Sequence, residues 1–433
     1  MAGVGRGWPI AGAGLTWRGP VCAALVACAR GDGHALSGLD AGGDATRVAS
    51  ADSGTSHGAR ASTPGGAASV GAVARAGALS VDGGPNGCRL LGGPFELPGG
   101  GLPALVVRGD DMLAVLNEDG HPRIIKFRAG PWAMGAQTNG PAPATPAPPR
   151  ALTVPCSVAA DEVFCPDRGG AVYRYPLGGG DRRWVANSRP GTRIATATVT
   201  DSVTVLAYLA SRKTTEGWVT EAWVAIDGDG PERLSEDGSG ATSVVLAVRG
   251  GSSLALTVDA RAALTPMHAR EVRYDHGLRL GDDVVIFVGG PGDPSSTAAL
   301  AVFPSGLVWG LLPIARDATS FGVATVRIDR PPQVDEPLVW SMYPDGLDPA
   351  PLATANTPGR TWVARVRPKG AGPRAPRTLE IGELSDSGTF DEAYVVPGAE
   401  AVTDVALATD GRGALWVGWR EGPRTWLERI ACS

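Results

Sequence analysis

One short pattern recurs along this sequence from about residue 100 to the end: an apolar run, a polar turn of two to four residues, and a second apolar run. The best two copies, ALVVRGDDMLAVL at 104–116 and VLAVRGGSSLALT at 245–257, share Val-Arg-Gly and the Leu-Ala that follows. The segments 299–310 and 405–417 follow the same scheme. These runs lack a 3.6-residue period and are bounded by Gly, Asp and Pro, so they are typical of β-hairpins.

Weaker copies of the hairpin begin near Leu152, Ile194 and Leu338, which gives seven starts spaced about 40 to 65 residues apart. Four-stranded propeller blades have such a period. On this spacing, residues 88–433 resemble β-propeller repeat proteins. The resemblance implies an all-β fold, a seven-bladed β-propeller of four-stranded antiparallel blades, with the domain at 87–433. Tandem β-sandwiches are the alternative, because they also show frequent turns between short strands.

Four cysteines of the repeat region, Cys88, Cys156, Cys165 and Cys432, allow three disulfide pairings. We expect Cys156–Cys165, which flank two short strands and a turn, and Cys88–Cys432, which lie at the two ends of the region. In a propeller the strand after Cys88 would complete the last blade, and the second disulfide would lock that seam. Metal binding by these cysteines is the rival interpretation. No Cys-x-x-Cys pair or nearby histidine supports it, so we expect no metal site and no cofactor.

The sequence before the repeats has a different character. A short apolar run at 20–27 ends at Cys28, and Leu25-Val-Ala-Cys28 resembles the lipobox of bacterial lipoproteins. The resemblance implies that 1–28 is an export leader and that Cys28 becomes lipidated. Residues 29–86 are rich in Gly, Ala, Ser, Asp and Thr, and we expect a disordered linker there. We therefore predict an exported, lipid-anchored protein of the bacterial outer membrane or periplasm. Export by another route and a chance Leu-Val-Ala-Cys are the alternatives.

Charge and hydropathy limit the partners. The net charge is -5, from 39 basic and 44 acidic residues, and the only lysines are Lys126, Lys213 and Lys369. Because no basic run or stripe appears, we expect no nucleic-acid partner. No segment approaches the roughly 20 apolar residues of a membrane-spanning helix. We therefore expect contact with the membrane only through the lipid anchor, and a monomeric chain.

No catalytic motif stands out in residues 87–433: neither Gly-x-Ser-x-Gly nor His-Glu-x-x-His occurs there. The most charged stretch is 265–283, which we interpret as a loop inserted between the second and third strands of the fourth unit. Propeller loops of that kind gather near the central channel, where ligands bind. A plain solvated loop is the simpler alternative. The candidate ligand-binding residues are His268, Glu271, Tyr274, Asp275 and His276.

Tryptophan is the other residue type that suggests binding, since aromatic rings stack on sugars and anchor protein interfaces. Most tryptophans lie at strand positions, so we expect packing between blades to account for most of them. The segment 410–416 resembles the hairpins of sensor-type propeller repeats and predicts a β-turn followed by a buried Trp416.

Three functions remain open. The leading hypothesis is a non-enzymatic, envelope-anchored propeller that acts as a scaffold or recognises a protein or polysaccharide ligand. The first alternative is a propeller hydrolase or lyase acting on glycans, with catalytic residues contributed by separate blades, which leaves no local sequence motif. The second alternative is a structural component of an outer-envelope assembly.

Overall fold

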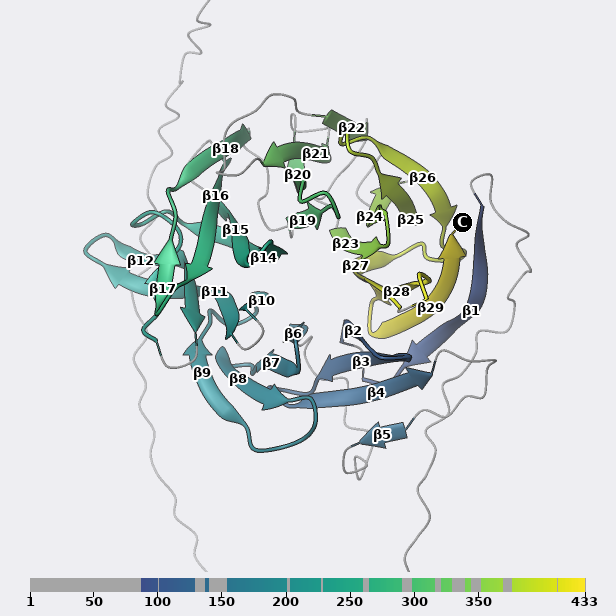
Figure 1. Cartoon of the computed structure of the whole chain (residues 1–433), viewed down its shortest axis with the longest axis horizontal. Coiled ribbons are helices and arrows are strands. Elements are labelled where there is room, and N and C mark those ends of the chain that lie inside the picture. Colours follow the sequence, from purple (N-terminus) through teal and green to yellow (C-terminus); the bar gives the residue numbers. More distant parts are fainter. Residues whose placement is uncertain are drawn as a thin grey trace, which may run out of the picture. The chain divides into compact units, whose positions relative to one another are not determined.

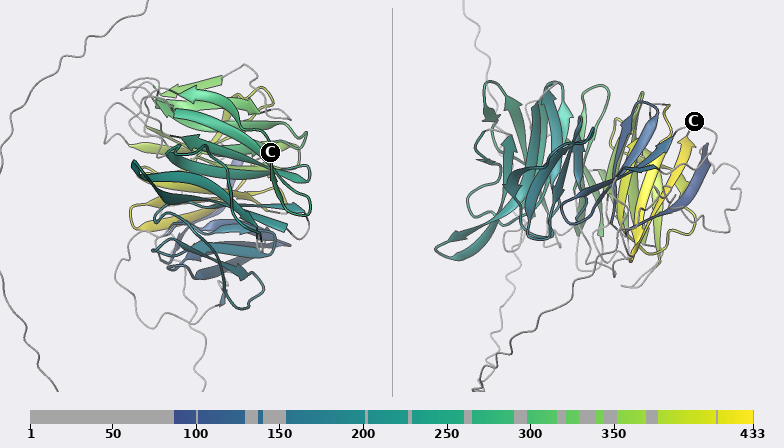
Figure 2. Two further views of the ribbon diagram at one scale, coloured as in Figure 1. Left: turned by 90° about the vertical axis from the view of Figure 1, so that its left-hand side faces the viewer. Right: turned by 90° about the horizontal axis from the view of Figure 1, so that it is seen from below.

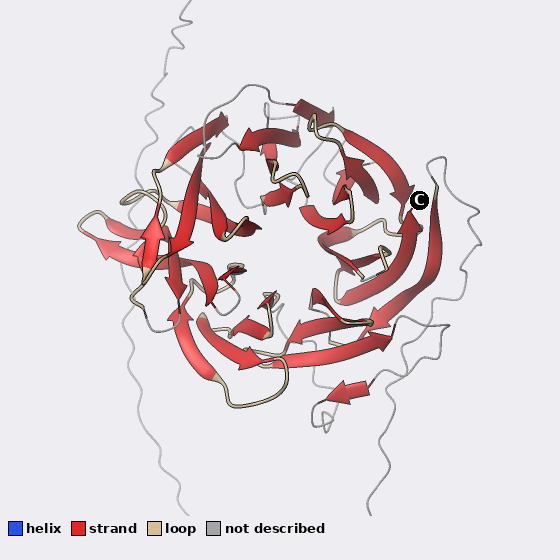
Figure 3. Cartoon of the chain, viewed as in Figure 1, coloured by secondary structure: helices blue, strands red, loops and turns tan. Residues whose placement is uncertain are grey.

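A computed structural model describes residues 87–99, 101–128, 137–139, 154–200, 203–226, 229–259, 265–289, 298–315, 321–328, 339–343, 352–368, 376–410 and 412–432. These residues form strands and turns and no helix (Figure 3). The predicted leader (1–28), with Cys28, and the predicted linker (29–86) lie outside the described residues, and both stay predictions. Among the described residues there is no helix long and apolar enough to span a membrane.

The strands form seven antiparallel sheets arranged as the blades of a β-propeller (Figure 1). Blade 1 consists of β2 (Ala104–Arg108), β3 (Asp111–Asn117), β4 (Pro122–Arg128) and β5 (Gln137–Asn139). Blade 2 consists of β6 (Ser157–Ala159), β7 (Glu162–Pro166), β8 (Ala171–Pro176) and β9 (Arg183–Asn187). Blade 3 consists of β10 (Ala195–Thr200), β11 (Val203–Thr214), β12 (Gly217–Ile226) and β13 (Glu232–Arg233).

The other blades repeat this order, with the first strand nearest the centre of the ring (Figure 1). Blade 4 consists of β14 (Ala241–Arg249), β15 (Ser252–Asp259), β16 (Thr265–Tyr274) and β17 (Leu278–Leu280), and β18 (Val284–Gly289) also pairs with β16. Blade 5 consists of β19 (Ala299–Val302), β20 (Val308–Ala315), β21 (Phe321–Ile328) and β22 (Val339–Tyr343). Blade 6 consists of β23 (Leu352–Thr357), β24 (Arg360–Pro368), β25 (Arg377–Leu384) and β26 (Phe390–Val395). Blade 7 consists of β27 (Val402–Thr409), β28 (Leu415–Glu421), β29 (Arg424–Cys432) and β1 (Cys88–Leu97).

The predicted hairpin repeat is confirmed as the first two strands of each blade, with one correction. A hairpin start was expected near Leu338, but the strand there is β22, the outermost strand of blade 5. The first hairpin of blade 6 begins instead at Leu352. The error has a simple cause, since a short apolar run looks the same in an outer strand as in an inner one.

The core lies between blades, because the middle strands bury both of their faces. Every residue of β15 is buried. Leu254 and Leu256 pack with residues of blade 5, whereas Ala255 packs with residues of blade 3. The side view shows the sheets standing face to face (Figure 2). Each blade is therefore stable only between two neighbours.

Blade 7 is completed by the start of the domain. Strand β1 pairs antiparallel with β29, and Cys88 lies opposite Cys432 and forms a disulfide with it, as predicted. The Thr425 hydroxyl donates a hydrogen bond of 3.1 Å to the Gly101 carbonyl on the way from blade 7 to blade 1. The two ends of the domain are thus joined both by backbone pairing and covalently.

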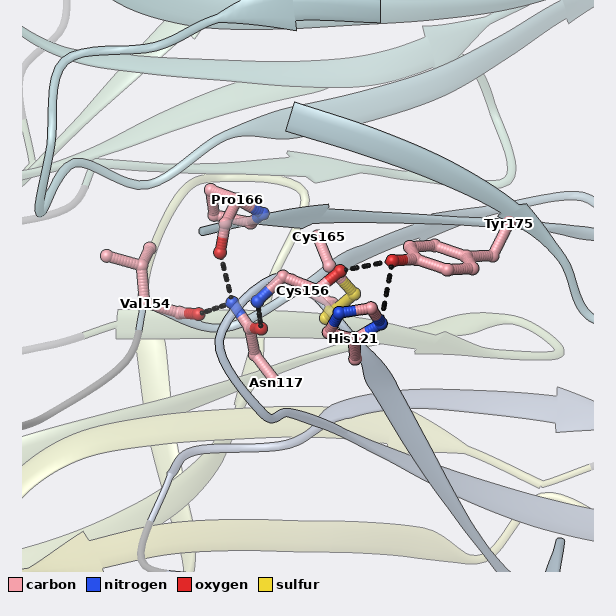
Figure 4. The surroundings of a disulfide bond; sticks show 8 residues. Asn117, His121, Val154, Cys156, Cys165, Pro166 and Tyr175 are labelled. Atoms are coloured by element: carbon pink, nitrogen blue, oxygen red, sulfur yellow. Dashed lines mark hydrogen bonds between the residues drawn. A yellow bond between two sulfur atoms is a disulfide. The ribbon is translucent and has the colours of Figure 1, made fainter. Parts of the chain in front are cut away.

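The second predicted disulfide, Cys156–Cys165, is also present and ties the entry of blade 2 to β7 (Figure 4). Beside it, the Asn117 side chain from blade 1 donates hydrogen bonds to the carbonyls of Val154 (2.8 Å) and Pro166 (2.7 Å). These contacts join the loops of blades 1 and 2. Both disulfides are compatible with an exported protein in an oxidising compartment.

One ion pair joins blades that are not neighbours. Arg193 precedes β10 of blade 3, and its guanidinium contacts the carboxylate of Asp404 on β27 of blade 7. Both residues lie at the beginning of an inner strand, so the pair spans the ring close to its centre. Asp404 also accepts a hydrogen bond from the backbone N–H of Val405 at 3.0 Å.

The seam also contains a buried acid. Glu428 on β29 is 1% exposed, and burial raises its pKa to about 8. The hydroxyl of Tyr394 from blade 6 lies near enough to interact with it, although the pair lacks the geometry of a hydrogen bond. Gly93 of β1 passes so close that an added Cβ would lie 2.9 Å from the Glu428 Cα, and its φ of 105° favours glycine. The carboxyl is therefore enclosed by both blades and by the closing strand.

We predict that the seam disulfide stabilises the fold more than the short-range one. The cysteines are 344 residues apart in Cys88–Cys432 and 9 apart in Cys156–Cys165. In the loop-entropy model this difference is worth about 3 kcal/mol. Urea unfolding of the Cys88→Ser/Cys432→Ser and Cys156→Ser/Cys165→Ser variants should show the larger loss in the first. Equal losses would contradict the ring-closure role of Cys88–Cys432.

We predict that Glu428 makes the protein less stable as the pH rises. Its pKa is about 8 in the folded chain against an ordinary 4.5, so its contribution to stability is complete below pH 4.5 and is lost as the pH rises through 8. The loss approaches about 1.4 kcal/mol per pH unit inside this window. Glu428→Gln keeps the shape of the neutral acid but cannot titrate. The free energy of unfolding of this variant should therefore lack the pH-dependent loss that Glu428 causes. If the free energies of unfolding of the wild type and of Glu428→Gln changed with pH in the same way, the Glu428 carboxyl would not be protonated at neutral pH and the prediction would be wrong.

Candidate functional site

A groove lies between the outer strands of blades 3 and 4, with a volume of about 690 Å³. It exists because the outer strands there are short: β13 has two residues and β17 has three. The middle strands of the two blades are therefore left partly uncovered at the rim. Six charged side chains line the groove: Glu232, Arg233, Glu236, Arg270, Arg279 and Asp283.

Arg270 of β16 holds the two walls together. Its Nε donates to the Gly281 carbonyl at 3.1 Å, and its NH1 group donates to the carbonyls of Arg233 (3.2 Å) and Leu234 (3.1 Å). The guanidinium thus connects blade 4 to the chain leaving blade 3. These bonds use three of the five N–H donors of Arg270, which thereby helps to shape the groove.

Arg233, on the other wall, belongs to an ion-pair network in blade 3. The fully buried carboxylate of Glu221 accepts two hydrogen bonds from Arg212, at 3.0 and 2.9 Å, and one from the Gly238 backbone at 3.1 Å. Arg233 lies 3.4 Å from the same carboxylate and 3.0 Å from Asp237. This wall is therefore held rigidly by charge-assisted bonds.

Two groove residues remain available to a ligand. Glu232 on the blade 3 wall and Arg279 on the blade 4 wall are both exposed. Within the described part of the chain, neither makes an ion pair or a side-chain hydrogen bond. The groove therefore offers one free carboxylate and one free guanidinium on opposite sides.

His268 lies buried behind the groove, on the side of β16 that faces blade 3. Its Nδ1 is 3.1 Å from an oxygen of Asp283, and its Nε2 is 3.6 Å from an oxygen of the fully buried Asp259. The hydrogen bond with Asp283 raises the pKa of His268 against the opposing effect of burial, and the charges of Asp283, Asp259 and Glu236 raise it further. Both ring nitrogens thus face carboxylates, so the imidazole acts as a tie between β15, β16 and the segment before β18.

The five predicted ligand-binding residues do not form one cluster. Glu271 is buried on the opposite face of β16, where Ser252 donates to it at 2.8 Å and Arg273 pairs with it. Tyr274 packs beside the core between blades 3 and 4. Asp275 and His276 form the exposed turn that leads to β17. None of the five lines the groove, although His268 contacts Asp283 of its lining and Tyr274 pairs in register with Leu278.

The interpretation of 265–283 as a channel-side loop was wrong. Residues 265–274 form β16, the third strand of blade 4, and 278–280 form β17 at the rim. The many charged residues of this segment suggested a solvated loop. In fact β16 pairs its charged side chains with neighbouring residues and buries Met267, Ala269 and Val272. Sequence reasoning also missed Glu232 and Arg279, since nothing in the sequence indicates which outer strands of two blades leave a groove.

Most tryptophans whose burial the structure describes pack against the core, as the sequence predicted, and Trp223 among them is partly buried. Five are buried between blades: Trp309, Trp362, Trp416, Trp419 and Trp426. The turn before Trp416 is confirmed, since Asp410 accepts hydrogen bonds from the backbone of Arg412 and Ala414. Two others are exposed, Trp184 by 55% on blade 2 and Trp218 by 73% at the tip of the β11–β12 hairpin.

No group of three or more His, Cys, Asp or Glu side chains in the described ranges has an arrangement suited to a metal ion. This holds for the cluster of Asp259, His268 and Asp283 as well.

No protein-family model matches the chain, and no curated protein sequence is significantly similar to it. Solved structures with a similar arrangement include the subtype N10 neuraminidase-like protein of A/little yellow-shouldered bat/Guatemala, at 10% identity and a TM-score of 0.39, covering 64% of this chain and 94% of that one. U3-55K has 13% identity and a TM-score of 0.42 and covers 80% and 99%. YCF48 from Cyanidioschyzon merolae has 10% identity and a TM-score of 0.39 and covers 79% and 98%. Likenesses this distant say nothing about function.

We predict that the His268–Asp283 pair stabilises blade 4 in a pH-dependent way. Because the pKa of His268 is raised above 6.5 in the folded chain, its stabilisation is complete below pH 6.5 and is lost as the pH rises through the folded value. At pH 6, His268→Gln should be less stable than the wild type by about 1 to 3 kcal/mol, as for a hydrogen bond to a charged group. The difference should shrink by pH 9 in urea unfolding, and comparison at equal pH cancels the contribution of Glu428. If the difference in stability between the wild type and His268→Gln increased with pH, the proposed His268–Asp283 ion pair would be wrong.

Proposed function

We propose that the chain is a non-enzymatic binding or scaffold protein of the bacterial cell envelope, anchored through Cys28, and that the groove between blades 3 and 4 receives a segment of a partner protein. The observation that carries the proposal is the free pair of opposite charges, Glu232 and Arg279, on the two walls. Complementary charges on a partner would fix its register and speed its association.

The lining of the groove favours a polypeptide over a sugar chain. None of the residues that line it has an aromatic ring, and stacking on such rings is a main source of sugar affinity. The two walls are braced by Arg270 and by the Glu221 network, so a ligand would meet preformed charges and little reorganisation would oppose binding.

The environment of His268 supports binding over proton transfer. A general base must reach the proton that it removes, whereas this imidazole is buried between two carboxylates. The groove does contain the carboxylates of Glu236 and Asp283. They are the groups that a glycan hydrolase would need, which makes hydrolysis the second candidate function.

The test is photo-crosslinking in the bacterium that encodes the chain. A photoreactive residue replaces Leu280, which lines the groove and leaves Arg279 in place, and a control chain carries it in place of Trp218 on the separate β11–β12 hairpin. We expect one protein to be trapped from position 280 and not from 218. The purified partner should bind the wild type at least tenfold more tightly than Arg279→Glu, because reversal places like charges together.

Two results would overturn this function. One is the same crosslinked products from both positions. The other is hydrolysis of an envelope glycan by the wild-type chain that is lost in Glu236→Gln or Asp283→Asn, which would establish the enzyme instead.

A further inference from the structure

A second surface, on blade 2, combines an exposed aromatic ring with an unpaired cation. Trp184 on β9 lies directly opposite Tyr173 on β8 in the antiparallel register. Residues paired in this way project from the same face with their Cβ atoms about 4.5 to 5.5 Å apart. The indole and the phenol therefore lie side by side on the outer part of the blade, where β8 and β9 are seen in Figure 1.

The indole is held in a fixed orientation although 55% of the residue is exposed. Its Nε1 donates a hydrogen bond of 3.2 Å to the side-chain oxygen of Asn187. Core packing explains the five buried tryptophans, but it does not explain a large ring that is oriented and left open to solvent. Such rings are common anchors for ligands.

Arg182 is fixed beside these rings. Its guanidinium carbon lies 4.6 Å from the centre of the Tyr173 ring, and its NH1 group donates to His121 Nε2 at 3.3 Å. His121 in turn lies 3.3 Å from the hydroxyl of Tyr175, which donates to the Gly120 carbonyl at 2.6 Å (Figure 4). His121, itself in contact with Tyr175, thus holds Arg182 in place from the side of blade 1.

Arg182 has no acidic partner among the described residues. Its neighbour Arg174 differs, because it forms an ion pair with Glu162. Arg182 thus presents a guanidinium whose position is set by the Tyr173 ring and the His121 imidazole, with no described carboxylate to balance its charge. A carboxylate is the group that such a fork binds best, through two parallel hydrogen bonds.

We propose that this face of blade 2 binds uronic-acid residues of an acidic polysaccharide, with the sugar ring on Trp184 and its carboxylate on Arg182. The apolar C–H face of a pyranose needs only a flat ring to stack on, and a uronic acid carries its carboxylate at the edge of that same ring. An acidic peptide is less suited, because it would have to enclose the indole in a pocket of its own. The site consists of residues of blade 2 and His121 of blade 1, and it does not depend on the groove between blades 3 and 4.

The test is calorimetric titration of the full chain with tetragalacturonate and with a neutral galactose tetramer of the same linkage. The wild type should bind the acidic ligand at least tenfold more tightly. Trp184→Ala should weaken binding of both ligands about tenfold, which corresponds to about 1.4 kcal/mol of lost stacking. Arg182→Gln should weaken binding of the acidic ligand alone and so abolish the preference.

Matched controls separate this site from others. Trp218→Ala removes the other exposed tryptophan, and Arg279→Ala alters the groove; both should bind tetragalacturonate as the wild type does. Trp184→Phe should retain most of the affinity, since it keeps a ring. No binding at 10 millimolar ligand, no preference for the acid, unchanged affinity in Trp184→Ala, or tighter binding of an oligo-aspartate peptide would each overturn the proposal.

Discussion

The pairing of β1 with β29 is the contact on which the rest of the structure depends. Each blade buries both faces of its middle strands, so no blade can stand at an open end of the ring without exposing apolar surface to water. Closing the ring with a strand from the opposite end of the domain removes both open ends at once. The disulfide between Cys88 and Cys432 acts on the same contact, because it prevents β1 from leaving blade 7. The Arg193–Asp404 pair adds a tie between blades 3 and 7 near the centre.

Packing on both faces also determines where polar groups can lie. Near the centre and between the middle strands, space is taken by aliphatic and aromatic side chains. Some polar residues that enter these interfaces pair with one another, as His268 does with Asp283. Among the described residues, the unpaired charges of Glu232, Arg279 and Arg182 lie on or beside the outer strands of their blades. Both proposed binding surfaces are therefore at the rim.

The repeated features of the fold could be predicted from the sequence, whereas features that occur once, such as the groove, could not. The hairpin pattern was sufficient for the seven blades, and the positions of Cys88 and Cys432 at the ends of the domain were sufficient for their pairing. The exact place of a strand within a blade was less certain, as the apolar run after Leu338 shows. The groove could not be predicted from the sequence, because it joins Glu232 and Arg279 from different blades. Their proximity depends on the lengths of β13 and β17, and those lengths leave no distinct residue pattern.

Because both proposed binding surfaces lie at the rim, ligands would bind on the outside of the ring and not in its centre. The centre of the ring is bridged by Arg193 and Asp404 where the inner strands begin, which leaves less room there for a ligand than an open channel would. Trp184 and Arg182 lie on blade 2, and the groove begins at blade 3, so the two proposed surfaces belong to successive blades. A protein bound in the groove and a polysaccharide bound on blade 2 would then be held by one rigid body. The chain would act by placing two envelope components side by side, which requires a closed ring and no chemistry of its own.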